Sequence, residues 1–326
     1  MGSRSSAGAK EGWCPISELL NPTFLTALIA GGLLAGVPLI FASLGETIAE
    51  QSGLLNVGLE GMMLTGAFVG FLAAMGSGNT WIGLAVGGMA GLLVSIVMVV
   101  FCVRLGLDQI IVGIAITLSA EGATSLLHGT MFGTSYPRLD AVPGFRIPVL
   151  SSIPILGDSL FNQPLPVYVA LMMVAFVSWL RLRTTIGLNL RAAGERPDSL
   201  DAAGVSVVMV RSGAELTCGA LAGVGGAYVS IVSAGTFVPF VTNGMGFIAI
   251  VIAMLGRGRP WWALIGSFLF GMSLSIATAL QVVGIDIPVD VVNTLPFISV
   301  IVILIVFARD ATLPAALGLP YLRGSR

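Results

Sequence analysis

Long apolar runs separated by short polar connections are the feature that most limits how this chain of 326 residues can fold. A helix needs roughly 20 residues to cross the hydrocarbon core of a bilayer, and a spanning segment must be helical because lipid leaves an open strand without hydrogen-bond partners. The sequence therefore predicts an all-α, polytopic transmembrane bundle of about 9–10 spans. The candidate spans are the runs 23–43, 61–75, 81–103, 109–127, 167–180, 212–232, 246–255, 261–281 and 289–307.

Composition excludes most other classes of protein. Hydrophobic residues make up 56% of the chain and charged residues 10%, against roughly a quarter charged in a soluble domain. A net charge of −1 offers no basic surface to nucleic acid, so we expect no polynucleotide partner. One histidine and three cysteines give no metal-ligand set, and no nucleotide-binding loop or nucleophile motif is present. We expect a protein that is not an enzyme, with no metal and no cofactor of its own.

The arginines predict the orientation. They cluster at 181–211, at 257–259 and in the C-terminal tail at 311–326, which are therefore expected in the cytoplasm. The segment 129–166, rich in Pro and Gly and balanced in charge, is then the main external loop of a transmembrane domain covering 23–310. With nine crossings the polar segment 1–22 would lie outside. A broken extra crossing at 45–60 would return it to the cytoplasm, and we favour that version.

One polar stretch separates the first two apolar runs. Residues 45–61, GETIAEQSGLLNVGLEG, contain Glu46, Glu50, Asn56 and Glu60. A carboxylate at the centre of a span costs roughly 2.5 to 3.5 kcal/mol, so three of them could not face lipid together. The three interleaved glycines indicate an interrupted helix, and non-helical backbone persists at membrane depth only where it is buried or lines a cavity. The stretch predicts a discontinuous element beside a translocation path, with a solvated connecting loop as the alternative.

The arginine-rich stretch 181–211 is too long for a tight turn. Pro197 can begin a helix there, with Asp198 and Asp201 near the positive N-terminal end of its dipole. This pattern predicts a short amphipathic helix on the cytoplasmic face, although a connector without a partner is also consistent with it. Within the fourth run, Glu121 is a candidate proton relay. Its polar neighbours favour a packing role equally, and His128 is expected at the membrane interface.

The sequence resembles the permease subunits of bacterial ABC importers in the branched-chain amino acid, ribose and nucleoside group. The resemblance is strongest to the nucleoside (simple-sugar) branch that works with basic-membrane-protein-type binding lipoproteins. Three motifs carry it: GETIAEQSGLLNVGLEGMMLTGA from Gly45, TTIGLNLRAAGERPDSLDAAGVSV from Thr184 and GFIAIVIAMLGRGRPWWALIGSFLFG from Gly246. The resemblance implies a permease similar to those of type II ABC importers, in the bacterial cytoplasmic (inner) membrane.

The resemblance also implies partners. A separate cytoplasmic ABC ATPase would bind ATP and Mg, a second related permease would complete the path, and an external substrate-binding lipoprotein would deliver a nucleoside or simple sugar. Membrane lipid would surround the permease, and the translocation path would run beside Glu46, Glu50, Asn56 and Glu60. The second motif would be the helix that docks on the ATPase, through Arg191, Ala192, Gly194, Glu195, Pro197, Asp201 and Gly204.

Two further expectations concern mechanism. The small residues Ala192, Ala193 and Gly194 are expected to let the ATPase approach closely. The alternative function is an ion-coupled secondary transporter, in which the intramembrane carboxylates Glu46, Glu50, Glu60 and Glu121 would bind protons or sodium ions.

Overall fold

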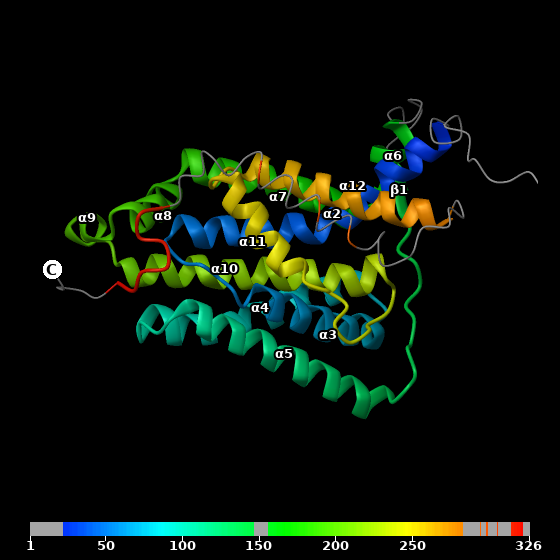
Figure 1. Cartoon of the computed structure of the whole chain (residues 1–326), viewed down its shortest axis with the longest axis horizontal. Coiled ribbons are helices and arrows are strands. Elements are labelled where there is room, and N and C mark those ends of the chain that lie inside the picture. The colour runs from blue at the N-terminus through cyan, green and yellow to red at the C-terminus, as the bar shows by residue number, and fades with distance from the viewer. Residues whose placement is uncertain are drawn as a thin grey trace, which may run out of the picture.

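The computed structural model describes residues 22–146, 156–282 and 314–321, together with Thr294, Ile298 and Ile305. The predicted segment 1–22, except for its last residue, lies outside this described part. The ninth apolar run, 289–307, also lies outside it, except for those three isolated positions. Within the described part, helices account for nearly all of the regular structure (Figure 1).

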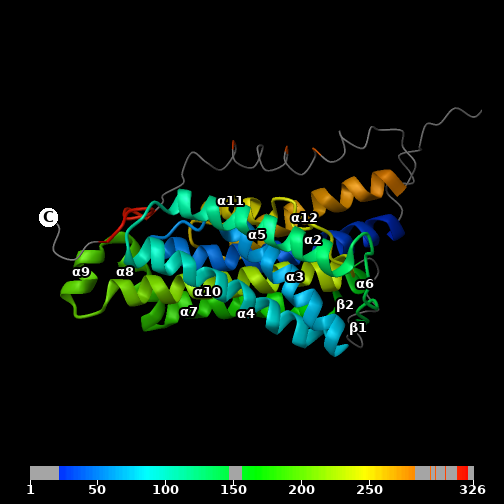
Figure 2. The same ribbon diagram turned by 90° about the horizontal axis from the view of Figure 1, so that it is seen from below.

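Helices aligned along one long axis form an elongated bundle (Figures 1 and 2). They are α2 Pro22–Gln51, α3 Leu59–Ser77, α4 Thr80–Met98, α5 Gln109–Phe132, α7 Leu165–Arg183, α10 Val207–Tyr228, α11 Met245–Gly256 and α12 Pro260–Val282. π-Helical turns extend α4 (η1, Val99–Arg104) and α10 (η3, Val229–Ser233). Six helices are long and apolar enough to cross a membrane, and α11 and the Pro260–Ile276 part of α12 are shorter apolar helices. The predicted polytopic helical bundle is confirmed, and eight of the nine predicted runs correspond to these helices.

Shorter elements mark the two ends of the bundle (Figure 1). The arginine-rich connection forms α8 Thr185–Glu195 and α9 Pro197–Ala202 at one end. At the opposite end β1 Gly144–Arg146 pairs antiparallel with β2 Asn162–Pro164, next to α6 Leu156–Phe161. Since arginine-rich connections stay in the cytoplasm, we take the end with the small sheet as the external end.

α2 continues without interruption through the region where we expected an extra crossing. Its bounds place Glu46 and Glu50 on the last turns of the first membrane helix. The connection 52–58 then leads directly into α3. The additional crossing at 45–60 is therefore wrong, and α2 begins at the external end of the bundle (Figure 1). Glu46 is hydrogen-bonded inside the bundle, and Glu50 is buried on the next turn, so neither carboxylate faces lipid.

Glycines bring α3, α4 and α10 into backbone contact. A Cβ atom added at Gly66 would lie 2.5 Å from the Cα atom of Gly223, and one added at Gly91 would lie 2.8 Å from the same atom. Side chains larger than hydrogen therefore cannot be placed at these crossings without moving a helix. Small residues serve this purpose in membranes because close packing, rather than exclusion of water, holds the helices together.

Candidate functional site

The connection between α2 and α3 is a buried, non-helical segment. Gly53 has a φ of 90°, a left-handed conformation that glycine adopts readily. Side chains satisfy the backbone here: the N–H of Leu55 donates to Gln109 Oε1 (2.7 Å) and the N–H of Asn56 donates to Glu46 Oε1 (3.1 Å). The predicted interruption of the helix is confirmed, and the alternative of a solvated loop is wrong.

Glu46 and Asn56 belong to a polar cluster between α2, this connection and α10. The amide Nδ2 of Asn56 donates to Glu215 Oε1 (2.6 Å), and the thiol of Cys218 lies 3.5 Å from Glu46 Oε2. All four residues are 0% exposed. Sequence analysis did not single out Glu215. An acidic residue within an apolar run is the signal that could have found it, as it found Glu121.

Glu60, in the first turn of α3, binds the start of α11. Its Oε1 accepts hydrogen bonds from Thr242 Oγ1 (2.5 Å) and from the N–H of Gly244 (2.9 Å), and its Oε2 accepts from the N–H of Gly246 (2.6 Å). Helix N-termini carry unpaired N–H groups and the positive end of the helix dipole, both of which favour a carboxylate. Glu60 is therefore an N-terminal cap for α11 that is supplied by another helix.

Glu50 lies one turn beyond Glu46 on α2 and faces the cytoplasmic end. It is buried, and its Oε1 has no hydrogen-bond partner within the described part of the chain. It lines a pocket of about 150 Å³ together with Gln51, Arg181, Arg191, Glu195, Met254, Arg257, Gly258 and Pro314. Glu46 and Glu50 are four residues apart on α2 and lie on one face of it, whereas the interruption at 52–58 separates Glu60 from both.

The four residues expected beside a translocation path are thus buried within a single chain, and the bond between Glu46 and the N–H of Asn56 helps to hold the interrupted segment in place. A role for them in passing solute stays a prediction. In the described residues, no group of three or more His, Cys, Asp and Glu side chains could hold a metal ion.

The arginine-rich connection folds into two short helices at the cytoplasmic end. The hydroxyl of Thr184 accepts the N–H of Gly187 (3.3 Å) and so caps α8, whereas α9 begins at Pro197, as the sequence predicted. Gly204 follows α9 with a φ of 85°. Of the residues expected to contact an ATPase, Arg191, Glu195 and Gly204 are exposed, and Ala192, Pro197 and Asp201 are partly exposed.

Gly194 does not lie on the outer surface of α8. It is buried, and a Cβ atom added to it would meet the carbonyl oxygen of Gln51 and lie 3.2 Å from the backbone nitrogen of Gly53. Ala193 is also fully buried. The expectation that these two small residues leave room for the ATPase is therefore wrong. They leave room for the end of α2, which packs directly on the backbone of α8.

Arg211, near the start of α10, joins three segments at the cytoplasmic end. Its guanidinium donates to the carbonyl oxygens of Ser52 (3.0 Å), Leu319 (2.8 Å) and Ala193 (3.4 Å). The C-terminal segment 314–321 also donates two backbone N–H groups, one to α8 and one to the α2–α3 connection. Sequence analysis counted Arg211 only among the arginines that set orientation, because bonds to backbone carbonyls leave no trace in a side-chain pattern.

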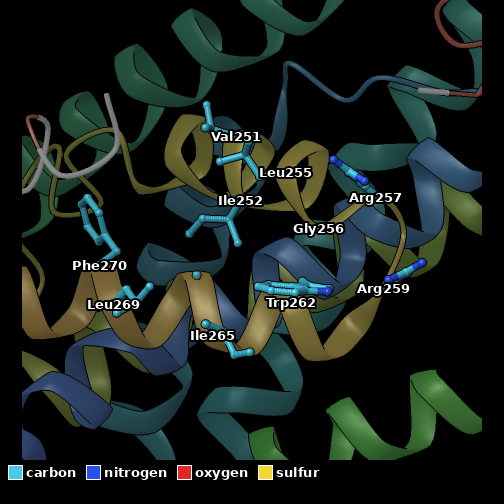
Figure 3. A pocket seen from close by; sticks show the side chains of 11 residues that line it. Val251, Ile252, Leu255, Gly256, Arg257, Arg259, Trp262, Ile265, Leu269 and Phe270 are labelled. Atoms are coloured by element: carbon cyan, nitrogen blue, oxygen red, sulfur yellow. The ribbon is translucent and has the colours of Figure 1, made fainter. Parts of the chain in front are cut away.

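An apolar cavity of about 270 Å³ opens between α11 and α12 (Figure 3). Val251, Ile252 and Leu255 of α11 and Trp262, Ile265, Leu269 and Phe270 of α12 line it. Arg257 and Arg259, in the turn between the two helices, lie at one end of it (Figure 3). This lining suits an apolar side chain or an acyl chain better than a polar solute.

A polar stripe follows the inner face of α5. Thr117 and His128 are buried, and Thr117 Oγ1 and His128 Nε2 have no hydrogen-bond partner within the described residues. Glu121 lies between them on the same face and is partly exposed. His128 lies about one turn before the end of α5 and packs against aromatic rings: its ring centroid lies 5.2 Å from that of Tyr136 and 5.7 Å from that of Phe237.

Comparison with known proteins gives a consistent result. Residues 28–307 match the family described as "Branched-chain amino acid transport system / permease component". The nucleoside ABC transporter permease protein NupC of Lactococcus lactis is 33% identical over 92% of this chain and 98% of its own length. The guanosine ABC transporter permease protein NupQ of Bacillus subtilis is 32% identical over 93% and 98%. A putative glucose ABC transporter permease protein of Haloferax volcanii is 34% identical over 77% and 76%. No solved structure gives a significant match.

Proposed function

This chain belongs to the family of permease components of branched-chain amino acid transport systems, and we propose that it forms part of the membrane path of an ATP-driven importer for a nucleoside. It is a multi-pass transport subunit of the bacterial inner membrane and not an enzyme. The observation that carries the proposed substrate is the pair of relatives named for nucleoside and guanosine transport, each aligned along more than nine-tenths of this chain.

A simple sugar is the second candidate substrate. A relative named for glucose transport shows a similar identity, 34%, but over a smaller share of this chain, 77%. The ion-coupled secondary transporter is not favoured, because the relatives are ABC transporter permeases and because Glu46 and Glu60 are already engaged in hydrogen bonds that hold helices together.

The proposal includes a cytoplasmic ABC ATPase that docks on α8 and α9. The exposed side chains of Arg191, Glu195, Arg196 and Asp198 support it, since they lie at the arginine-rich end of the bundle and face away from the chain. The nearby pocket beside Glu50 adds Arg181 and Arg257 to this surface. A docked partner would press on α8, which contacts the end of α2 through Gly194.

A second permease and an external binding lipoprotein complete the proposed assembly. Support for the second permease comes from residues 234–244, which are non-helical and partly exposed beside α3. Non-helical backbone at membrane depth cannot face lipid, so another chain or a water-filled path must cover it.

Reconstitution tests the proposed function. The permease, its ATPase, a second permease and the binding lipoprotein would be assembled in proteoliposomes, and uptake of radiolabelled guanosine, adenosine and glucose would be measured. We expect nucleoside uptake that requires ATP and persists when an ionophore collapses the proton gradient. Uptake by this chain alone without ATP would contradict the proposal, and ATP-dependent uptake of glucose only would favour the sugar importer.

A further inference from the structure

Residues 234–244 descend through the membrane without forming a helix. At the external end Gly235 accepts the N–H of Leu139 (2.7 Å), whereas the ring centroid of Phe237 lies 5.0 Å from that of Phe68, in the middle of α3. Lower down, Thr242 and Gly244 bind Glu60 at the start of α3. Phe68 and Glu60 are eight positions apart on α3, which is about 12 Å of helix at about 1.5 Å per residue, so the segment runs for at least this distance through the membrane.

One side of this segment is uncovered. Phe240 is 53% exposed and Val238 is 41% exposed, and Asn243 is exposed as well. Lipid cannot satisfy the backbone groups of a non-helical segment, and an exposed amide such as that of Asn243 is costly in hydrocarbon. This side must therefore meet water or another protein chain.

The polar stripe of α5 borders the same segment. His128 is 2% exposed and packs against Phe237, yet its Nε2 has no hydrogen-bond partner among the described residues. Glu121 is seven residues earlier on α5, so it lies on the same face, about 10.5 Å deeper in the membrane. An acidic side chain in the middle of a spanning helix faces a bundle interior or a watery cavity rather than lipid. The polar stripe of α5 and the uncovered side of 234–244 therefore form one continuous surface, which we call the substrate wall.

We propose that residues 237–243, with the stripe of α5 formed by Thr117, Glu121 and His128, are the part of this chain that contacts the nucleoside during transport. The inference rests on the proposed function. The base would stack on the exposed ring of Phe240, because an aromatic ring offers a face to any base. The hydroxyl groups of the ribose and the polar edge of the base would exchange hydrogen bonds with Asn243, Glu121 and His128 Nε2, which supply both donors and acceptors.

This site differs from the one that the sequence predicted. Glu46 and Glu60 accept hydrogen bonds from partners inside the chain, whereas Phe240 and Asn243 are uncovered and Thr117 and His128 carry unpartnered polar atoms. The motif at 45–61 would then hold residues 237–243 in position, because Glu60 binds the start of α11.

Thiol labelling of the complete transporter in proteoliposomes tests whether the wall meets water. Cysteine would replace Phe240 or Asn243 in a chain with Cys14→Ser; Cys102 and Cys218 are buried and can remain. The matched control is Leu118→Cys, which is 62% exposed on the outer face of α5. A small, membrane-impermeant cationic methanethiosulfonate should label Phe240→Cys and Asn243→Cys at least tenfold faster than Leu118→Cys. Equal rates for all three variants would overturn the proposal.

Two conservative variants test contact with the base. Phe240→Tyr keeps an aromatic face, whereas Phe240→Leu keeps only apolar bulk. We expect Phe240→Leu to raise the KM for guanosine uptake at least fivefold and Phe240→Tyr to change it less than twofold. An equal KM for the two variants would overturn stacking. If the unmodified complex took up no nucleoside, the proposed function would fail, and fast labelling would still show this wall to be the path.

Discussion

Glu60 and Gly246 are 186 positions apart in the sequence, yet the carboxylate of Glu60 accepts the backbone N–H of Gly246 at 2.6 Å. The same side chain also binds the two residues that end the segment 234–244. The non-helical segments 52–58 and 234–244 are therefore linked through the beginning of α3. A shift of the cytoplasmic end of α2 can reach the proposed substrate wall by this route, because 52–58 leads directly into the turn of α3 that carries Glu60.

The first prediction concerns this link. Glu60→Ala removes the acceptor of three hydrogen bonds and leaves the N–H groups of Gly244 and Gly246, at the start of α11, without that acceptor. Each hydrogen bond to a charged group contributes about 1.5 to 3 kcal/mol. We therefore expect Glu60→Ala to lower the free energy of unfolding by about 3 kcal/mol or more, measured by thermal unfolding in detergent.

Glu60→Gln is the matched variant, since its amide oxygen can still accept one or two of these bonds, and it should lose less stability than Glu60→Ala. Glu195→Ala is the control, because Glu195 is exposed on α8. Equal melting temperatures for Glu60→Ala and the unmodified protein would show that the bonds contribute nothing to stability.

The second prediction concerns Asn56 and Glu215, which are joined by a 2.6 Å hydrogen bond between 0% exposed residues. Asn56→Asp would place a third carboxyl group beside Glu215 and Glu46, and buried carboxyl groups in contact destabilise one another. Adding Glu215→Gln exchanges the two groups and restores one amide beside one carboxyl group. We expect the double variant to be more stable than Asn56→Asp alone, in thermal unfolding and in expression level. Equal or greater loss in the double variant would contradict the pairing.

Much of the fold could be predicted from hydrophobicity alone. The runs that became α4 and α5 are long and apolar, and Asn79 and Asp108 cap their first turns through side-chain oxygens that accept backbone N–H groups. The end of α2 could not be predicted in the same way. Its polar residues resemble a connection in sequence, but segments distant in sequence bury them: the thiol of Cys218 on α10 lies 3.5 Å from Glu46 Oε2, and Gln51 donates to the carbonyl oxygen of Gly258.

The candidate site was predicted less well, for a related physical reason. The motif at 45–61 was found because carboxylates near a span are conspicuous, but burial between helices is a tertiary property that a local pattern does not record. Residues 234–244 contain no charged residue, and so no local pattern pointed to Phe240 or Asn243. Their importance follows only from the absence of a helix at membrane depth.

The third prediction concerns Arg211. Its guanidinium donates to three carbonyl oxygens on three segments, and lysine, with one ammonium group on a differently shaped side chain, cannot reproduce this fork. We expect Arg211→Lys to destabilise the protein by about 2 kcal/mol and to make the segment 314–321 sensitive to proteases. Arg196→Lys, at an exposed position, is the control. Unchanged protease resistance in Arg211→Lys would show that the backbone bonds of 314–321 suffice to hold it.

The last prediction separates an internal contact from a docking contact at Gly194. A methyl group there would meet the carbonyl oxygen of Gln51, and overpacking of this kind costs about 1 to 3 kcal/mol. Gly194→Ala should therefore lower the melting temperature of the permease by itself, with no ATPase present.

The matched variant is Ala202→Trp, at an exposed position of α9, where a large side chain has room in the isolated permease. We expect Ala202→Trp to melt normally alone and to reduce co-purification of the ATPase, because the added indole would obstruct the surface on which the partner docks. Gly194→Ala should have a smaller effect on co-purification of the ATPase, because it changes the docking surface only indirectly, by displacing α8. A Gly194→Ala permease that melts normally alone but fails to retain the ATPase would place Gly194 against the partner, and would mean that α8 turns its inner face outward in the assembled transporter.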